Sequence, residues 1–375
     1  MVEPKQRADM HNHLNRRSFM AAAGFLGLSL AGRHLLPPTK VTSLDSQGTS
    51  PEEYTFAQSH PARLDLWGRI TDDGTPVRTT TGLGTPVAGF LRRNTVLPLF
   101  EEVHAPGSNP NNDLWYRVRD GFLYTSSVQR IKPYHMPEAA TQLDDTFGFW
   151  AEVIVPYSLA RTQPGGPVAS ADDGSQTVLY YASVYHVIGV EADEAGYLWY
   201  KLKDDKPHAL PIYGLARHLR RITEADLAPI HPGADKRIIV TLDKQRIDCY
   251  EADNLVYSTL TSSGGAGFET PRGEWWVVLK QPSRHMYSDP ELEAFSDPNY
   301  FDLPGVPFNT FFTTMGNAIH GTYWHGDFGR PRSHGCLNVT PEAARWIYRW
   351  VDPVASYSSD FVPADERTGT HVVVK

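Results

Sequence analysis

Two stretches of this chain repeat one another at an offset of about 80 residues. The first runs from Trp67 (WGRITDDGTPVRT) to Trp115 (WYRVRD), and the second runs from Trp150 (WAEVIVPYSLART) to Trp199 (WYKLKD). In both copies an Arg-Thr pair follows the leading Trp by 11 residues, and the Trp-Tyr element follows it by 48 or 49. The offset is far longer than a solenoid period, so it predicts two copies of a small domain.

The local pattern favours short strands. Polar and apolar residues alternate after both Trp-Tyr elements, and 30 Gly and 29 Pro interrupt the apolar runs of the 375 residues. In the last third, RIIVTL, RIDCYEA, NLVYSTLTSS, EWWVVLK and the closing THVVVK are also predicted as strands. Thr340 and Pro341 begin a short helix as N-cap and first residue, with a buried stripe of Ala343, Ile347 and Trp350. We expect a mainly β chain of more than one domain.

The N-terminal segment has the pattern of an export signal. Arg16 and Arg17 precede an apolar, uncharged run from Met20 to Ala31, which resembles a twin-arginine signal. The run is shorter than the roughly 20 residues that a membrane-spanning helix needs. An amphipathic first helix of a cytosolic protein is the alternative, but this run is apolar on all sides. We therefore expect residues 1–50 to be a signal and linker that export the chain to the cell envelope.

Charge and cysteine content exclude two classes of protein. The 35 Lys and Arg against 43 Asp and Glu give a net charge of −8, which offers no basic footprint for nucleic acid. Two cysteines, Cys249 and Cys336, are too few for a disulfide framework. Cys249 shares a strand face with Ile247 in RIDCYEA, so we expect a small buried thiol there. Cys336 lies among glycines and histidines instead.

Residues 319–339, IHGTYWHGDFGRPRSHGCLNV, concentrate the candidate chemistry. A zinc site could use the side chains of His320, His325, His334 and Cys336. Their spacing fits none of the usual paired ligand patterns, and a glycine follows each histidine. We therefore expect no metal here.

A cysteine nucleophile fits the same stretch better, and it needs a base and donors for an oxyanion. Gly335 permits a sharp turn before Cys336, so that the amides of both residues can face a carbonyl under attack. A strand that ends at Ile319 brings His320 nearby, and Gly321 leaves room around the ring. An imidazole beside a thiol favours the thiolate, whose usual pKa of about 8.5 is otherwise too high.

This motif resembles the signature of the L,D-transpeptidases with a YkuD-type catalytic domain. It consists of His-Gly-Thr at 320–322, a Gly-containing stretch, and Ser-His-Gly-Cys-Leu-Asn at 333–338. KRIIVTLDKQRIDCYEADNLVYSTLTSSGG resembles the opening hairpin of the family, and ETPRGEW at 269–275 resembles its T-P-x-G-x-aromatic element. The resemblance covers roughly residues 235–375.

The resemblance implies a β-sandwich-like catalytic domain that builds or remodels peptidoglycan. Cys336 would be the nucleophile and His320 the base, oriented by the carbonyl of Gly321, while His334 and Gly335 shape the oxyanion pocket. A thioester would form with a tetrapeptide stem, release D-Ala and pass to an amine of a second stem as a 3→3 cross-link. No metal or organic cofactor is implied, and the expected partners are peptidoglycan stem peptides.

The substrate-binding candidates flank this turn. Ser333 is expected to hydrogen-bond within the turn, and Tyr323 and Trp324 to line the cleft. Arg332 could bind a carboxylate of the stem through its guanidinium, or could be a solvated turn charge. Asn338 occupies a position where many members of the family have Arg. This difference concerns which substrate is bound and leaves the expected chemistry unchanged.

The two repeated copies resemble bacterial SH3-like barrels, in which a Trp-Tyr-basic-apolar strand precedes a strand such as Gly121–Tyr124 (GFLY). We expect one SH3-like domain at 51–135, a second with its linker at 136–232, and the catalytic domain at 233–375, in a monomer. The copies would bind a ligand in the envelope or serve as a spacer.

Two other functions fit the same residues. Water could accept the acyl group, which would make the protein an L,D-carboxypeptidase or hydrolase. A protein that only binds the cell wall would have a decayed site, whereas this motif is intact. We expect membrane contact only through an uncleaved signal.

Overall fold

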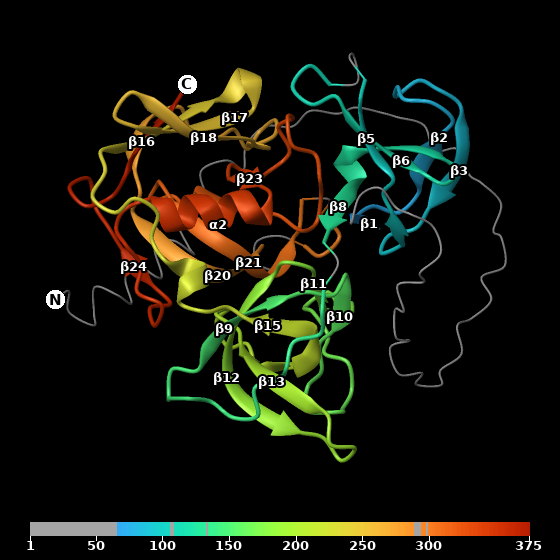
Figure 1. The fold of residues 1–375 in the computed structure, drawn as a ribbon, viewed down its shortest axis with the longest axis vertical. Coiled ribbons are helices and arrows are strands. Elements are labelled where there is room, and N and C mark those ends of the chain that lie inside the picture. The colour runs from blue at the N-terminus through green and yellow to red at the C-terminus, as the bar shows by residue number, and fades with distance from the viewer. Residues whose placement is uncertain (1–65, 106–108, 133, 289–293, 298) are drawn as a thin grey trace.

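The computed structural model describes residues 66–375 apart from 106–108, 133, 289–293 and 298. The expected export signal therefore lies outside the described residues. Strands dominate the described chain, which has one α-helix, α2 (Pro341–Trp350), so the expectation of a mainly β protein is confirmed. Within the described ranges, no helix has the length and apolar character to cross a membrane. Figure 1 shows three groups of sheets that follow one another along the chain.

The first unit, residues 66–131, contains a sheet in the order β4-β1-β8 and another in the order β3-β2-β7-β6-β5. A 3-10 turn, η1 (Thr125–Ser127), precedes β8, which returns antiparallel to β1. The strands are β1 (Trp67–Ile70), β2 (Thr75–Arg78), β3 (Val87–Leu91), β4 (Val96–Pro98), β5 (Glu101–His104), β6 (Leu114–Val118), β7 (Gly121–Tyr124) and β8 (Val128–Ile131).

The second unit, residues 149–221, contains a sheet in the order β14-β13-β12-β9-β15 and the pair β10-β11. Its last strand follows a 3-10 turn, η2 (Ala216–His218), and pairs with its first strand, as in the first unit. The strands are β9 (Phe149–Val153), β10 (Tyr157–Leu159), β11 (Val178–Tyr180), β12 (Val184–Ala192), β13 (Leu198–Lys203), β14 (Ile212–Leu215) and β15 (Leu219–Arg221).

The predicted SH3-like barrels are not confirmed. In the described residues, each unit forms two hydrogen-bonded sheets with no ladder between them, so neither closes into a barrel. The shared arrangement of first strand, 3-10 turn and returning strand agrees with the sequence repeat. The sequence repeat therefore predicted the matching strands of the two units but did not predict whether each sheet closes into a barrel.

The C-terminal unit, residues 236–374, stacks two five-stranded sheets, in the orders β18-β17-β16-β25-β19 and β23-β22-β21-β20-β24. The closing strand, β25, lies parallel to β16. The first sheet contains β16 (Lys236–Thr241), β17 (Arg246–Glu251), β18 (Asn254–Leu260), β19 (Gly273–Trp276) and β25 (His371–Val374). The second contains β20 (Leu279–Tyr287), β21 (Asp302–Phe311), β22 (Ala318–Gly321), β23 (Leu337–Val339) and β24 (Val362–Pro363). Two 3-10 turns, η3 (Ala225–Leu227) and η4 (Leu242–Lys244), precede and follow β16.

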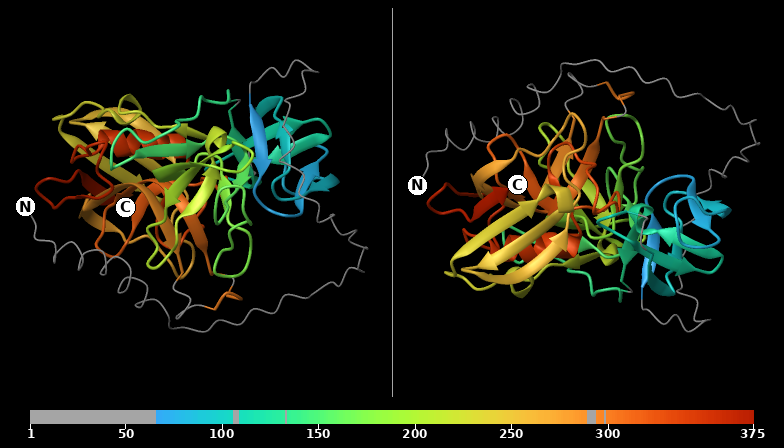
Figure 2. Two further views of the ribbon diagram at one scale, coloured as in Figure 1. Left: turned by 90° about the horizontal axis from the view of Figure 1, so that it is seen from below. Right: turned by 90° about the horizontal axis from the view of Figure 1, so that it is seen from above.

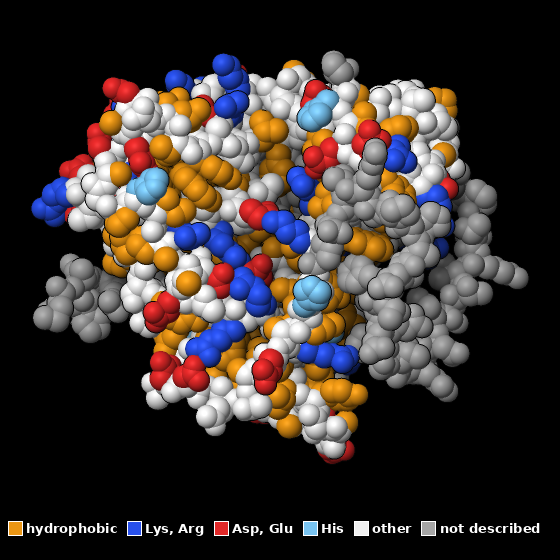
Figure 3. Space-filling model, viewed as in Figure 1, with side chains coloured by type: hydrophobic (Ala, Val, Ile, Leu, Met, Phe, Trp, Pro, Cys, Tyr) orange, Lys and Arg blue, Asp and Glu red, His pale blue; other side chains and the backbone are white. Residues whose placement is uncertain are grey.

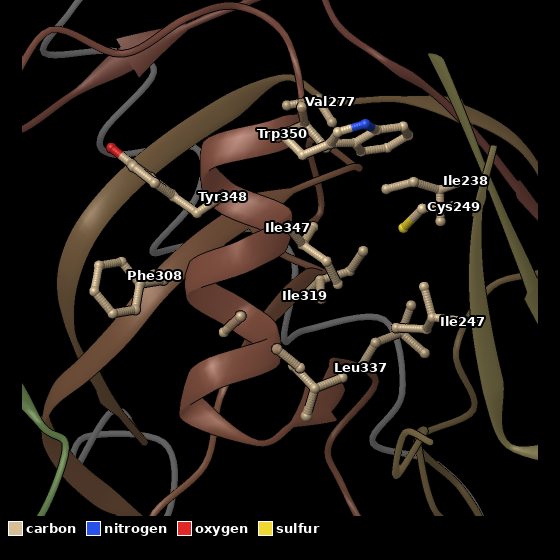
Figure 4. Close-up of a cluster of buried hydrophobic side chains, with 14 of the residues drawn as sticks. Ile238, Ile247, Cys249, Val277, Phe308, Ile319, Leu337, Ile347, Tyr348 and Trp350 are labelled. Atoms are coloured by element: carbon tan, nitrogen blue, oxygen red, sulfur yellow. The ribbon is translucent and has the colours of Figure 1, made fainter. Parts of the chain in front are cut away.

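Helix α2 fills the core between these sheets (Figure 4). Its N-cap is confirmed, because the side chain of Thr340 accepts a hydrogen bond from the amide of Ala343. Ile347 points toward Ile319 of β22, and the hairpin β16–β17 covers the opposite side of the cluster. Cys249 belongs to this cluster and is fully buried, and burial raises the pKa of its thiol. It is therefore the inert core thiol that the strand pattern predicted.

The core around α2 also includes the second unit. Trp150, Val184 and Ile222 lie in the same buried cluster as Ile319 and Ile347. Figure 2 shows the second unit against the C-terminal unit from two directions, with the first unit at one end. The second unit therefore shares a buried core with the C-terminal unit.

Acidic and basic side chains are interspersed on one face of the molecule (Figure 3). On the face drawn in Figure 3, Lys and Arg lie among Asp and Glu with no extended field of either sign. This distribution agrees with the small net charge of −8 and with the absence of a basic footprint in the sequence.

Candidate active site

Strands β22 and β23 bring the two halves of the sequence motif together. They run parallel, with Ile319 opposite Leu337 and His320 opposite Asn338. Successive side chains of a strand point to opposite faces, so Cys336, one residue before β23, lies on the face that carries His320. The side chains of Ile319 and Leu337 point the other way, toward α2 (Figure 4). Cys336 and His320 are therefore diagonal neighbours on one face of adjacent strands.

His320 is buried and has a defined tautomer. Its Nδ1 lies 3.1 Å from the carbonyl oxygen of Gly321. A carbonyl can only accept, so Nδ1 carries the proton and Nε2 keeps its lone pair, as a base requires. Burial lowers the pKa of His320 to about 4, although the hydrogen bond to Gly321 opposes that shift. The ring is therefore neutral at neutral pH.

Cys336 is half-buried, and its sulfur faces the turn that joins β21 to β22. Its S–H donates to the carbonyl of Gly316 over 3.7 Å. Burial raises the pKa of the thiol to about 11, and a backbone hydrogen bond at Ala318 acts in the opposite direction. Burial therefore favours the neutral thiol over the thiolate that the sequence pattern predicted. Among the described residues, the sulfur makes its hydrogen bond to Gly316 and none to His320, so a rotation of the thiol is needed before the two side chains can exchange a proton.

The turn that precedes Cys336 uses the hydroxyl of Ser333 internally. Gly335 has a φ of +107°, which favours glycine. Its amide donates to Ser333 Oγ over 3.1 Å, and that hydroxyl donates to the carbonyl of Cys336 over 2.5 Å. The expected pair of oxyanion donors is therefore reduced to one. Among the described residues, the amide of Cys336 has no hydrogen-bond acceptor.

His334 packs between aromatic side chains beside this turn. Its ring lies edge-on to Phe268, with 4.5 Å between centroids, and is tilted against Phe301 at 5.1 Å. The side chain therefore forms part of the wall next to the turn. Its expected role in shaping the pocket remains a prediction.

His325, which the sequence offered as a zinc ligand or as a loop histidine, is buried near His320. Its Nδ1 accepts from the amide of Asp327 over 3.1 Å, and its Nε2 lies 2.9 Å from the side-chain amide of Asn338. The atom of Asn338 that faces this nitrogen is Nδ2, and the donor and acceptor roles in this pair depend on the tautomer of the ring. Burial lowers the pKa of His325 well below its usual value, with smaller effects from Arg332 and His320. No sequence pattern distinguishes this residue from a solvated loop histidine.

The structure separates the two aromatic residues expected to line the cleft. Trp324 is half-buried, and its ring lies 5.8 Å from that of His320. Tyr323 is only 1% exposed, stacks on Tyr180 of the second unit, and donates its hydroxyl to the carbonyl of Pro304. Tyr323 is therefore covered by the second unit, and its expected place in the cleft wall stays a prediction.

Arg332 also differs from its expected role. Its guanidinium lies 3.5 Å from Asp72 of the first unit and 3.8 Å from Asp327. A stem carboxylate would have to compete with both of these carboxylates. Arg332 therefore links the loop between β22 and β23 to the first unit in this structure.

The first unit holds the loop between the two halves of the motif. Arg69, only 1% exposed, donates to Gln129 Oε1, Asn94 Oδ1 and the carbonyl of Tyr323. Gln129 donates in turn to the carbonyl of Tyr181 in the second unit. These contacts join both N-terminal units to the chain segment that begins at His320.

Gly326 marks the closest approach of that loop to the first unit. Its amide donates to the carbonyl of Ser126 over 2.8 Å. A Cβ at Gly326 would lie 2.3 Å from the carbonyl oxygen of Thr125 and 2.6 Å from that of Val128. Glycine is therefore required here by the packing of one backbone on another. In the described part of the chain, no cluster of three or more His, Cys, Asp or Glu is placed to hold a metal ion.

The neutral thiol makes a testable prediction about alkylation. Only the thiolate reacts, so with a pKa of about 11 the labelling rate of Cys336 by iodoacetamide should rise roughly tenfold per pH unit from about pH 7 to 9. Buried Cys249 should remain unlabelled in the folded protein. Peptide-resolved mass spectrometry over time measures both rates. A Cys336 rate that is flat across this range would indicate a thiolate at rest and contradict the prediction.

Comparisons with known proteins match the unit that contains this site. Residues 235–374 match the family model of the L,D-transpeptidase catalytic domain, YkuD. A protein of Bacillus licheniformis named "Putative L,D-transpeptidase YkuD" is 28% identical over 106 residues, which are 28% of this chain and 52% of that protein. This chain therefore spans about half the length of that curated relative.

Solved structures of L,D-transpeptidases are also similar to parts of the chain. The one from Mycobacterium smegmatis has a TM-score of 0.32 and 19% identity, and covers 50% of this chain and 99% of its own. The one from Enterococcus faecium has a TM-score of 0.29 and 20% identity, and covers 38% of this chain and 50% of its own. The match of the family model to residues 235–374, which contain both halves of the motif, identifies this part of the chain as an L,D-transpeptidase catalytic domain of the YkuD type.

Proposed function

We propose that this chain is an exported cysteine L,D-transpeptidase that cross-links peptidoglycan stem peptides through a thioester on Cys336. The observation that carries the proposal is the parallel pairing of β22 and β23, which puts His320 and Cys336, the residue before β23, on one face inside the matched domain. The ring of His320, whose proton lies on Nδ1, is the proposed base, and the amide of Cys336, which has no acceptor among the described residues, is the proposed oxyanion donor.

In the first half-reaction, Cys336 Sγ attacks the carbonyl that joins the third residue of a tetrapeptide stem, a diamino acid, to its terminal D-Ala. Both groups are neutral at rest, so the thiol proton passes to His320 Nε2 as the C–S bond forms. The amide of Cys336 donates to the oxygen that becomes negative. The C–N bond then breaks, the imidazolium protonates the departing amine, and D-Ala leaves a thioester behind.

In the second half-reaction, a side-chain amine of another stem attacks the thioester carbonyl. His320 Nε2 accepts a proton from this amine, the C–S bond breaks, and the sulfur recovers the proton. The product is a 3→3 amide cross-link and a regenerated neutral pair. Energy comes from the donor amide and is kept in the thioester, so these steps use no nucleotide, metal or organic cofactor.

The remaining parts of the proposal concern location and the N-terminal units. The Arg16-Arg17 pair and the apolar run from Met20 to Ala31 support export, and peptidoglycan stems are reached only outside the membrane. Residues 51–135 and 136–232 are proposed as two SH3-like modules, on the basis of the sequence repeat and the matching strand and turn order. The contacts of the first unit with the loop at 323–332, together with the stacking of Tyr180 of the second unit on Tyr323, support a role in shaping the site in a monomer.

Incubation of the purified protein with a tetrapeptide stem tests the proposal. Intact-mass analysis should detect a tripeptidyl adduct on the protein, together with free D-Ala and a cross-linked dimer of stems. Tripeptide and D-Ala without dimer would favour the alternative, an L,D-carboxypeptidase with water as acceptor. Absence of both the adduct and D-Ala would refute the enzyme and leave the third candidate, a protein that only binds the cell wall.

A further inference from the structure

The carbonyl of Gly335 accepts two side-chain hydrogen bonds. Asn317 Nδ2 donates to it over 3.1 Å, and Thr270 Oγ1 donates to it over 3.0 Å. Asn317 follows the turn between β21 and β22, whereas Thr270 precedes β19. Two segments that are distant in sequence therefore meet at one carbonyl beside the nucleophile.

Both donors are themselves held in place. Thr270 is 3% exposed, and its hydroxyl accepts from the amide of Gly264 over 3.0 Å, so its proton faces Gly335. Asn317 Oδ1 accepts from the hydroxyl of Thr313 over 2.8 Å, and Thr313 Oγ1 accepts from the amide of Asn317 over 3.1 Å. The side-chain amide cannot rotate without losing these bonds, so its NH₂ group stays directed at the carbonyl.

Glycine at position 335 makes this contact sterically feasible. A Cβ built on Gly335 would lie 2.6 Å from Asn317 Nδ2, and the φ of +107° already disfavours other residues. Because Gly335 has no Cβ, the side-chain amide of Asn317 can come close enough to hydrogen-bond the backbone at this position. Gly335 therefore has two roles: it adopts the positive φ of the turn, and it leaves room for the donor group of Asn317.

We propose that Asn317 and Thr270 are positioning residues that aim the amide of Cys336 at the carbonyl under attack. The carbonyl of Gly335 and the N–H of Cys336 belong to one planar trans peptide, in which they point in opposite directions. Two donors that fix the oxygen therefore fix the direction of the N–H as well. They also polarise the peptide, which strengthens the N–H as a donor. This inference rests on the proposed function, since the oxyanion arises only in acyl transfer.

The arrangement predicts different effects on two reactions of Cys336, its acylation by a stem and its alkylation by iodoacetamide. Its sulfur contacts the backbone at Gly316 and Ala318 and neither of the positioning side chains. Removal of either donor should therefore impair acylation, which forms an oxyanion, and leave alkylation by iodoacetamide unchanged, since that displacement forms none. A general loosening of the turn would change both rates together.

The test compares Thr270→Val with the conservative Thr270→Ser in the full chain, and uses Asn317→Ala as an independent variant. For Thr270→Val and Asn317→Ala, acylation by a tetrapeptide stem, followed by intact mass, should slow roughly 10- to 100-fold. Iodoacetamide labelling of Cys336 should stay within about twofold of wild type, and Thr270→Ser should restore acylation.

Two results would overturn the inference. One is an acylation rate near wild type in both Thr270→Val and Asn317→Ala, and the other is an equal fall of acylation and alkylation. A wild-type protein that forms no adduct would instead refute the proposed function. The variants thus test the positioning role of Asn317 and Thr270, and the wild type tests the proposed function.

Discussion

Replacement of Cys336 by alanine is expected to abolish the acyl-enzyme and to lower the rate of D-Ala release by at least about 10⁴-fold. The loss is this large because the chain has no second thiol in reach: Cys249 is fully buried in the core around α2. Intact mass with a tetrapeptide stem measures the adduct, and an assay for free D-Ala measures the rate.

Cys249→Ala is the matched control for this variant. It removes the other sulfur from a position that faces α2 and away from the site, so acylation should persist. An adduct on Cys336→Ala, or its loss in a folded Cys249→Ala, would contradict the assignment of the nucleophile.

Replacement of Arg69 by methionine should produce the largest loss of stability. Burial lowers the pKa of Arg69 to about 10, so the guanidinium is still charged at neutral pH. Its removal leaves the oxygens of Asn94, Gln129 and Tyr323 without this donor. Each buried acceptor that loses its partner costs about 1–3 kcal/mol, so the free energy of unfolding should fall by about 3 kcal/mol or more. Urea unfolding followed by tryptophan fluorescence measures the change.

Arg119→Met serves as the control, because Arg119 is exposed and its substitution should change stability by less than about 0.5 kcal/mol. The Arg69 variant should also slow acylation, since Tyr323 precedes Trp324, which lies against His320. Equal stability of the two variants would show that the buried network does not hold the units together.

Local patterns in the sequence predicted much of the C-terminal unit. Thr340 and Pro341 begin α2 where capping rules place it, and the alternation in RIDCYEA predicts that Ile247 and Cys249 share a buried face. The spacing of His320 and Cys336 indicated that two chain segments meet, and the parallel pairing of β22 and β23 brings them together. These features depend on backbone geometry and on polarity within a few residues.

The protonation state of the site could not be read in this way. The sequence places an imidazole near a thiol, which favours an ion pair, but in the folded chain both groups are desolvated. The direction of each pKa shift depends on how completely distant segments exclude water. The same holds for Tyr323, whose burial comes from Tyr180 of the second unit.

The residues alone were enough to predict the strand-rich character, the repeat, the capped helix and the candidate catalytic side chains. The folded chain was needed to show that the first unit packs on the loop beside His320. It was also needed to show that, within the described residues, the repeated units form no closed barrel and the amide of Cys336 has no acceptor. The difference comes from the distance along the chain over which each interaction acts. Strand alternation, turns and caps arise from neighbours in the chain, whereas desolvation and the choice of hydrogen-bond partner are set by groups such as Arg69 and Tyr323, which are 254 residues apart.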